Sequence, residues 1–337
     1  MDVGWDPVAR KVRVVHPVRV DKQGIAGPTS GQVRGPNWRR TSAGLFVPAE
    51  VLDDTVEQRI VEAAARVKTG AVTGWAALRL HGGGYFDGLA HDGRTRRPVA
   101  LATGRDRLRP RAGVELHRAE VTDDEAVVRY GVRCVTAERA LFDEMRWTSS
   151  LEERVGAMDM AAAAQLTSIA RMSAYARDQR RKPGRFAVTE ALWWADEHAW
   201  SPQEVRLRMI WRRVIRAKPL CNRPVLDLDG GLIGIPDLLD EESGMAGEFN
   251  GAVHRTRTRY QRDVHREDKF RRAGLEPFTV VGDDLDNEAL VIDRMQAARE
   301  RAGRNPRRWV VAAEARPTLD ERLDLRDRAL RLADGTR

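Results

Sequence analysis

The sequence predicts a chain of mixed α+β and α/β class, with three folded regions and a charged tail. Apolar residues recur at helical spacing in some stretches and alternate with polar residues in others. Turns rich in Gly, Asp and Ser separate these stretches. The pattern changes three times, so the expected regions are residues 1–70, 71–200, 201–313 and 314–337. We expect a middle α+β region and a third, α/β region with a mixed sheet flanked by helices.

The composition favours a folded, basic protein. With 42% hydrophobic residues and nine tryptophans among 337, the chain can bury real cores, which excludes wholesale disorder. The net charge of +8 favours a polyanionic partner such as nucleic acid. Cys134 and Cys221 are far apart and form no Cys-x-x-Cys pair, which argues against a disulfide framework and a thiolate zinc site. The chain begins without an apolar leader and contains no run of 18 apolar residues, so we expect a cytoplasmic protein that does not bind membranes.

The sequence of the first region, residues 1–70, predicts a hairpin and a helix. Alternating residues from Trp38 to Pro48 flank a turn at 42–44, which is typical of a short hairpin. The stretch 55–68 places apolar residues at helical spacing after Thr55, a good N-cap. Residues 17–37 are rich in glycine and too short for a full recognition helix.

The sequence of the middle region, residues 71–200, predicts strands followed by helices. Residues 97–135 alternate apolar and polar side chains, and a glycine between VVRY and VRCV marks a turn. Thr136 is the expected N-cap of the helix TAERALFDEMRW. Three further helices are expected, at Leu151–Gln165, Ile169–Gln179 and Ala187–His198. The tryptophans Trp75, Trp193 and Trp194 are interpreted as core residues.

The third region begins with a helix and continues with strands. Ser201, Pro202 and Glu204 form a capping-box pattern at the start of SPQEVRLRMIWRRVIRA. The segments PVLDL, GLIGIPDLL and MAGEFNG are separated by Asp-Gly-Gly and Glu-Ser-Gly turns, as in neighbouring strands. A basic helix over 263–273, the strand PFTVV and the helix NEALVIDRMQAARERAG complete the pattern.

Two carboxylates on adjacent strands suggest a metal site. Asp237 and Glu248 flank a predicted hairpin, and hard cations such as Mg²⁺ or Mn²⁺ prefer several charged oxygens close together. Because side chains alternate along a strand, Glu248 and Asn250 share one face. The alternative is that each carboxylate is an ordinary solvated turn residue.

The basic helix beyond these strands suggests a phosphate-binding surface, since arginine and lysine neutralise the DNA backbone. The alternative is a solvated helix face, in which the basic residues pair with acidic residues one turn away. In the first region, the basic segment around Trp38 is expected to contact DNA backbone as well. The residues predicted to bind nucleic acid are Arg39, Arg40, Arg257, Arg259, Arg262, Arg266 and Lys269.

The motifs of the third region resemble those of a known nuclease family. S-P-x-E on a helix, then P-D-L-L, G-E-F-N-G-x-x-H and R-E-D-K-F-R-R-A-G-L over residues 201–302 resemble the very-short-patch-repair branch of the PD-(D/E)-x-K, restriction-endonuclease-like superfamily. The earlier segments WRRTSAGLFVP and TAERALFDE resemble the winged-helix N-terminal region and following domain of abortive-infection-type antitoxins. The first region would then be a degenerate winged helix.

The resemblance implies a role for five residues. Asp237 and Glu248 would be the metal ligands, and Glu204 would be a helix-borne glutamate that supports the metal. His254 lies where related repair nucleases place a histidine. Asn250 stands where the superfamily has lysine and this branch often has aspartate, and an amide carries no charge and cannot act as a general base. The alternative for Glu204 is that it only caps its helix, because a capping box explains a glutamate at this position without any catalytic role.

Three functions are open at this point. The first is a Mg²⁺- or Mn²⁺-dependent DNA endonuclease or nickase in defence or repair, with His254 or Lys269 replacing the missing lysine. The second is a non-catalytic DNA-binding repressor or antitoxin-like protein that carries a degenerate nuclease fold. The third is a scaffold. A homodimer, a toxin partner and a modification-enzyme partner are also left open.

Overall fold

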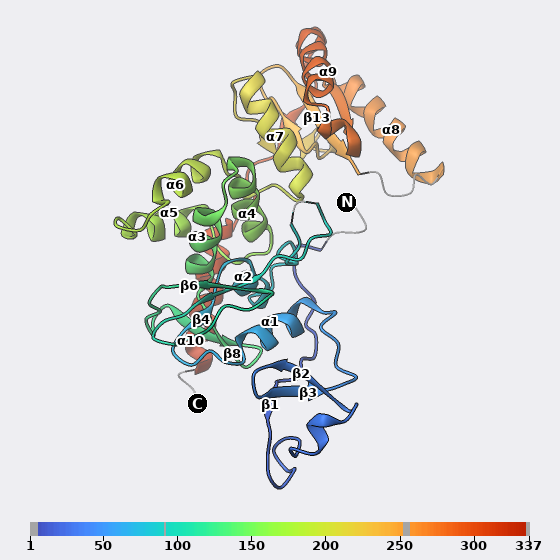
Figure 1. Cartoon of the computed structure of the whole chain (residues 1–337). Coiled ribbons are helices and arrows are strands. Elements are labelled where there is room, and N and C mark those ends of the chain that lie inside the picture. The colour runs from blue at the N-terminus through green and yellow to red at the C-terminus, as the bar shows by residue number, and fades with distance from the viewer. Residues whose placement is uncertain (1–5, 91, 252–256, 335–337) are drawn as a thin grey trace. The chain divides into compact units, whose positions relative to one another are not determined.

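The computed structural model describes residues 6–90, 92–251 and 257–334, and the side chains of 257–264 and 334 lie outside this description. The chain is of mixed α+β class, as the sequence predicts. It forms two compact units. The N-terminal unit contains residues 6–148 and 171–188, and the C-terminal unit contains 149–170 and 189–337 (Figure 1). The division into four regions stays a prediction.

The N-terminal unit begins with a small antiparallel sheet of order β1-β3-β2. The predicted hairpin is present, and Gly44 adopts a φ of 75° in its turn. Among residues 6–37 the only helical element is a three-residue 3-10 turn, η1, so no α-helix precedes the hairpin there. The winged-helix interpretation stays a prediction. The elements are β1 (Val18–Arg19), η1 (Gln32–Arg34), β2 (Trp38–Ser42) and β3 (Leu45–Pro48).

A five-stranded sheet of order β6-β5-β4-β8-β7 follows. The side chain of Thr55 accepts a hydrogen bond from the Gln58 backbone and caps α1, which ends at Ala64, before the expected Lys68. Trp75 in α2 is buried, as expected. The elements are α1 (Val56–Ala64), β4 (Ala71–Val72), α2 (Gly74–Leu80), β5 (Val99–Ala102), β6 (Val114–His117), β7 (Ala126–Arg129), β8 (Val132–Val135) and α3 (Ala137–Trp147).

Helices α5 (Ile169–Asp178) and α6 (Arg185–Trp194) each contribute residues to both units. The expectation that Trp193 is a core residue is wrong, because its side chain is 68% exposed. The guanidinium of Arg212 lies 4.3 Å from the centre of its ring. An arginine stacked on an exposed indole therefore replaces the expected apolar packing.

The C-terminal unit is built on a four-stranded mixed sheet of order β14-β13-β12-β9. Strands β13 and β14 are parallel, whereas β12 is antiparallel to both β13 and β9. A second, three-stranded sheet has the order β11-β10-β15. The strands are β9 (Leu220–Cys221), β10 (Val225–Leu226), β11 (Leu232–Gly234), β12 (Leu238–Leu239), β13 (Met245–Asn250), β14 (Glu276–Val281) and β15 (Val310–Val311).

Helices pack on both faces of the four-stranded sheet (Figure 1). Trp211 of α7 and Met295 of α9 share a buried cluster with Phe278 of β14 on one face. Phe270 of α8 shares the other cluster with Ala246 of β13. The helices and the remaining 3-10 turn are α4 (Leu151–Ala163), α7 (Pro202–Val214), α8 (Arg257–Ala273), η2 (Gly282–Asp286), α9 (Glu288–Arg301) and α10 (Leu319–Asp334).

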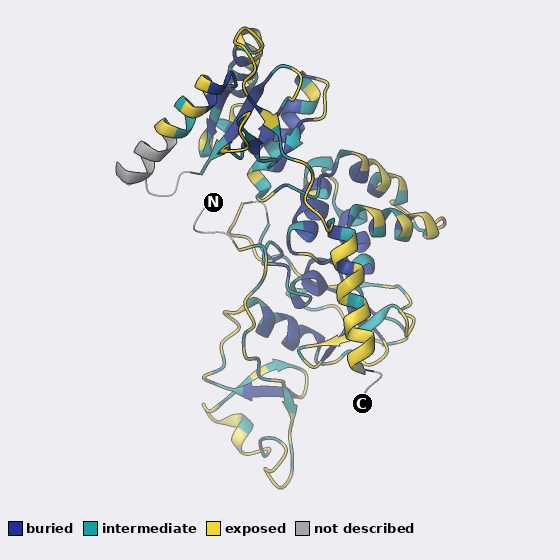
Figure 2. Cartoon of the chain, turned by 180° about the vertical axis from the view of Figure 1, so that it is seen from behind, coloured by how far each residue is buried: buried dark blue, intermediate teal, exposed yellow. Residues whose placement is uncertain are grey.

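A buried ion pair joins α4 to α7. Arg208 Nη2 donates to Asp159 Oδ2, and both side chains are almost fully buried. Helix α10 covers most of the charged tail. Leu319 and Leu323, one turn apart, are buried and anchor the start of α10, whereas most of the rest of this helix is exposed (Figure 2). In the part of the chain that the structure describes, no helix combines the length and the apolar character needed to span a membrane.

Candidate active site

Asp237 and Glu248 occupy opposed positions at one end of the β12–β13 pair. Leu238 pairs with Gly247 in the antiparallel register, so the next step outward places Asp237 opposite Glu248. The backbone N–H of Phe249 donates a 2.7 Å hydrogen bond to Asp237 Oδ2, which connects the two segments beyond the last ladder pair. Two residues that the sequence places eleven positions apart are therefore neighbours in the sheet.

Both carboxylates lie on the face of the sheet that packs against α8. Leu239 and Ala246 belong to the cluster that contains Phe270 of α8. Since side chains alternate along each strand, Asp237 is on the same face as Leu239, and Glu248 is on the same face as Ala246. Asn250, two residues beyond Glu248 at the end of β13, is on this face too.

Glu204 reaches the same region from the first turn of α7. Ser201 caps the helix by accepting a hydrogen bond from the Glu204 backbone N–H, which is one half of the predicted capping box. The Glu204 carboxylate accepts hydrogen bonds from the Ser201 hydroxyl and from the Trp200 backbone N–H, which takes the place of the Ser201 N–H. Glu204 Oε2 also accepts a 2.7 Å hydrogen bond from Asn222 Nδ2. The backbone N–H of Asn222 in turn donates to the carbonyl of Asp237. The cap therefore fixes Glu204 and, through Asn222, links it to the strand of Asp237.

The three acids interact electrostatically. Burial, together with the negative charges of Glu204 and Glu248, raises the pKa of Asp237 to about 8. Burial also raises the pKa of Glu204. Negative charges that lie close together in a partly buried site repel one another, so the site favours binding of a proton or of a metal cation.

Arg266 of α8 supplies one positive charge to this site. Its Nη2 donates to Glu248 Oε1, and only 4% of Glu248 is exposed. Arg266 is one of the predicted DNA-binding residues, and the structure places its guanidinium on the candidate metal ligand Glu248; its contact with DNA stays a prediction. No general pattern in the sequence distinguishes this arginine from its neighbours in the basic helix.

The other predicted residues on and before α8 are only partly described. The backbone at Arg257, Arg259 and Arg262 is helical, so α8 begins six residues before the expected Asp263. The side chains of these arginines lie outside the description. Lys269 is exposed on α8. His254 lies outside the described residues.

The two predicted DNA-binding arginines of the N-terminal unit differ in environment. Both Nη atoms of Arg39 donate to the Glu62 carboxylate, at 3.0 and 2.6 Å, and the same guanidinium donates to the Val51 carbonyl. Arg39 is therefore engaged in holding β2 against α1. Arg40 is exposed, and its Nε donates to the Ser42 carbonyl. An exposed guanidinium is the better candidate for a backbone phosphate.

Asn222 is the residue of this site that sequence reasoning missed. Its φ of 47° lies in the left-handed region, which asparagine tolerates better than most residues. It is buried, and its amide also donates to the His198 carbonyl at 2.7 Å. An asparagine directly after a short apolar strand and two residues before Pro224 was the available signal.

The donor set fits a hard divalent cation. Among the described residues, no three His, Cys, Asp or Glu side chains form a complete metal-holding group. Mg²⁺, however, is commonly held by one or two carboxylates, with water and substrate phosphate filling the other positions. Opposed carboxyl groups at Asp237 and Glu248, with the pKa of Asp237 raised by burial and by its acidic neighbours, match that requirement. Comparison of the chain with protein-family models, with curated proteins and with solved structures gives no match.

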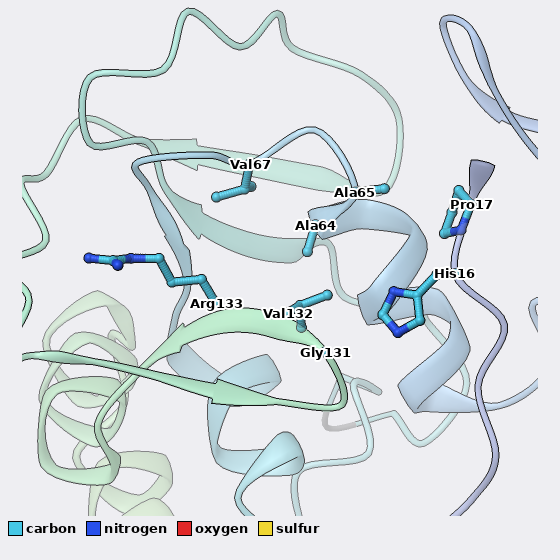
Figure 3. A pocket seen from close by; sticks show the side chains of 8 residues that line it. All are labelled: His16, Pro17, Ala64, Ala65, Val67, Gly131, Val132 and Arg133. Atoms are coloured by element: carbon cyan, nitrogen blue, oxygen red, sulfur yellow. The ribbon is translucent and has the colours of Figure 1, made fainter. Parts of the chain in front are cut away.

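A separate cavity in the N-terminal unit contains none of the predicted residues. It has a volume of about 180 Å³ and is lined by residues that include His16, Val67, Gly131 and Arg133. Figure 3 shows these side chains, which come from the segment before β1, the end of α1 and the β7–β8 hairpin. The cavity is smaller than typical ligand pockets of about 300–1,000 Å³.

Proposed function

We propose that this protein is a divalent-metal-dependent endonuclease or nickase that hydrolyses phosphodiester bonds in DNA, in defence or repair. The observation that carries the proposal is the convergence of Glu204, Asp237 and Glu248 at one end of a mixed sheet, beside the basic helix α8. The strands of the four-stranded sheet and two of its helices follow the chain order α7, β9, β12, β13, α8, β14, with β10 and β11 of the second sheet inserted between β9 and β12. This order is compatible with the restriction-endonuclease-like fold that the sequence motifs imply.

Each residue of the site has a distinct task in this proposal. Asp237 and Glu248 would hold Mg²⁺ or Mn²⁺. When bound, such an ion polarises a phosphoryl oxygen and lowers the pKa of a bound water. Glu204 and Asn222 orient the Asp237 segment through the hydrogen bonds described above. Asn250 can orient a water through its amide, but it cannot remove a proton.

A plasmid assay tests the proposal directly. Purified protein with Mg²⁺ or Mn²⁺ is expected to nick or cut supercoiled plasmid, and Asp237→Asn and Glu248→Gln are expected to abolish this activity. Asp293→Asn is the matched control, because it neutralises an exposed acid on α9 of the same unit. Cutting that survives both site substitutions would reject the assignment of the site.

A non-catalytic DNA-binding protein is the second candidate. Two observations favour it: the uncharged Asn250 beside Glu248, and the guanidinium of Arg266 on Glu248. In that case the wild type binds DNA with a steep salt dependence but never cuts it. Asn250→Lys separates the two candidates, because a gain of cutting would show that only the third residue of the site is lacking.

A further inference from the structure

The ion pair between Arg266 and Glu248 joins the basic helix to the candidate metal site. Glu248 lies on the central strand β13 with 4% of its surface exposed, so its charge needs a partner. One partner comes from α8, the helix that follows β13 in the chain and packs on the same face of the sheet. The acid and its counterion are therefore eighteen residues apart and belong to consecutive elements.

The guanidinium of Arg266 has hydrogen-bonding capacity left. Its Nε has no hydrogen-bond partner among the described residues, and 37% of the side chain is exposed to solvent. Phe270 flanks it, with its ring centre 6.0 Å from Cζ. A guanidinium has five N–H groups in a planar fork that matches a phosphate. Arg266 is thus placed to contact an arriving phosphate without a large movement of its helix.

A guanidinium and a divalent cation compete for the same carboxylate. With Arg266 on Glu248 Oε1, one negative charge of the site is already neutralised, and the guanidinium repels a second cation at short range. A DNA phosphate that draws the guanidinium away would remove this positive charge from Glu248 Oε1 and lessen the repulsion of a divalent cation there. The exposed basic residues Lys269 and Arg272 on α8 favour the approach of such a phosphate.

We propose that Arg266 is a built-in counterion that holds Glu248 until a DNA phosphate takes its guanidinium, so that divalent-cation binding at Asp237 and Glu248 depends on DNA. This inference rests on the proposed function, and it adds that DNA regulates the binding of the metal ion. The coupling is reciprocal, because the cation must then tighten DNA binding by the same factor by which DNA tightens cation binding.

The test measures Mn²⁺ binding by electron paramagnetic resonance, with and without a hydrolysis-resistant phosphorothioate duplex. In the wild type, the duplex is expected to tighten Mn²⁺ binding at least tenfold. Arg266→Gln is expected to bind Mn²⁺ at least tenfold more tightly than the wild type without DNA, and to gain less than threefold from the duplex. Asp237→Asn with the duplex supplies the background from Mn²⁺ held by DNA itself.

Arg271→Gln is the matched control, since Arg271 lies on the same helix and pairs with Glu267 rather than with Glu248. It is expected to keep the wild-type coupling. Wild-type Mn²⁺ binding that is lost in Asp237→Asn but is unaffected by DNA would overturn the counterion role and leave the metal site intact. This comparison needs no Arg266 variant, so it remains decisive if Arg266→Gln does not fold. Mn²⁺ binding that is insensitive to Asp237→Asn in every state would overturn the proposed metal site and the counterion role together.

Discussion

Arg208 of α7 and Asp159 of α4 form an ion pair in which 1% and 0% of the two side chains are exposed. This pair fixes the helix that carries Glu204 to a helix outside the sheet. Within the described residues, Nε and Nη1 of the arginine are buried without a hydrogen-bonded oxygen or nitrogen, so the desolvation of this side chain is only partly offset. The position of α7, and with it the capping box, therefore depends on a contact that is sensitive to substitution.

Removal of one partner of this pair is predicted to be costly. Arg208→Met leaves the buried carboxylate of Asp159 unpaired and is expected to lower the free energy of unfolding by roughly 3–5 kcal/mol. The double substitution Asp159→Leu with Arg208→Met removes both charges and is expected to recover most of that loss. Urea titrations of the single and double variants measure the difference. Equal losses in both would show that the arginine contributes mainly by packing.

The raised pKa of Asp237 predicts a pH-dependent stability. The folded protein holds this proton up to about pH 8, whereas the ordinary value is 3.8, so the folded state binds more protons in that interval. Stability contributed by this proton is present at low pH and is lost as the pH rises towards 8. Asp237→Asn, which cannot ionise, is expected to gain stability relative to the wild type between about pH 4 and pH 8, with a slope of at most about 1.4 kcal/mol per pH unit.

Urea unfolding of wild type and Asp237→Asn at pH 5 and pH 8.5 measures this effect. Asp293→Asn, which changes an exposed acid, should follow the wild type at both pH values. Added Mg²⁺ is expected to stabilise the wild type at pH 8.5 more than Asp237→Asn, since a cation bound only by the folded state adds stability. A difference between wild type and Asp237→Asn that does not change with pH would mean that the Asp237 carboxyl titrates normally.

Arg39 and Arg40 are adjacent in sequence but are predicted to respond differently to substitution. Arg39→Ala removes the two-pronged contact to Glu62, of which 7% is exposed, and is expected to cost roughly 2–3 kcal/mol of stability without changing DNA affinity. Arg40→Ala is expected to leave stability unchanged and to weaken DNA binding equally for all sequences. Thermal unfolding and fluorescence anisotropy with a labelled duplex separate the two. The reverse result would place Arg39 on the DNA.

Gly247 of β13 is predicted to resist substitution because two rings approach its Cα. A Cβ there would lie 2.8 Å from Phe278 Cζ and 3.5 Å from Trp211 Cζ3. Gly247→Ala is therefore expected to destabilise the C-terminal unit by about 1–3 kcal/mol, the usual cost of overpacking. Gly31→Ala, where the nearest atom would be 3.9 Å away, is the control. An unchanged unfolding midpoint for Gly247→Ala would mean that Phe278 can move aside at no cost.

Local signals predicted much of the fold. The hairpin before Pro48 was confirmed because its turn requires a positive φ, and Gly44 supplies that conformation. The start of α7 was confirmed because the hydrogen bond of an N-cap forms between residues three positions apart, here Ser201 and Glu204. The strand MAGEFNG was confirmed as β13 because its alternation separates two buried clusters.

The features that could not be predicted depend on contacts between distant residues. Asn222 joins the site because its left-handed backbone turns its amide towards Glu204, which no spacing rule encodes. Arg266 is one basic residue among many until the packing of α8 places it against Glu248. Trp193 has a large apolar side chain, yet it is exposed at the surface, where Arg212 stacks on its ring.

The place of β13 between β12 and β14 has a consequence for how this chain tolerates insertions and deletions. A slip of one residue along β13 would turn Glu248 towards Trp211 and would bring Phe249 against α8. The same shift would break the parallel ladder with β14 and the antiparallel ladder with β12. The insertion or deletion of a single residue in this strand would thus disturb the folding of the sheet and the geometry of the candidate site together.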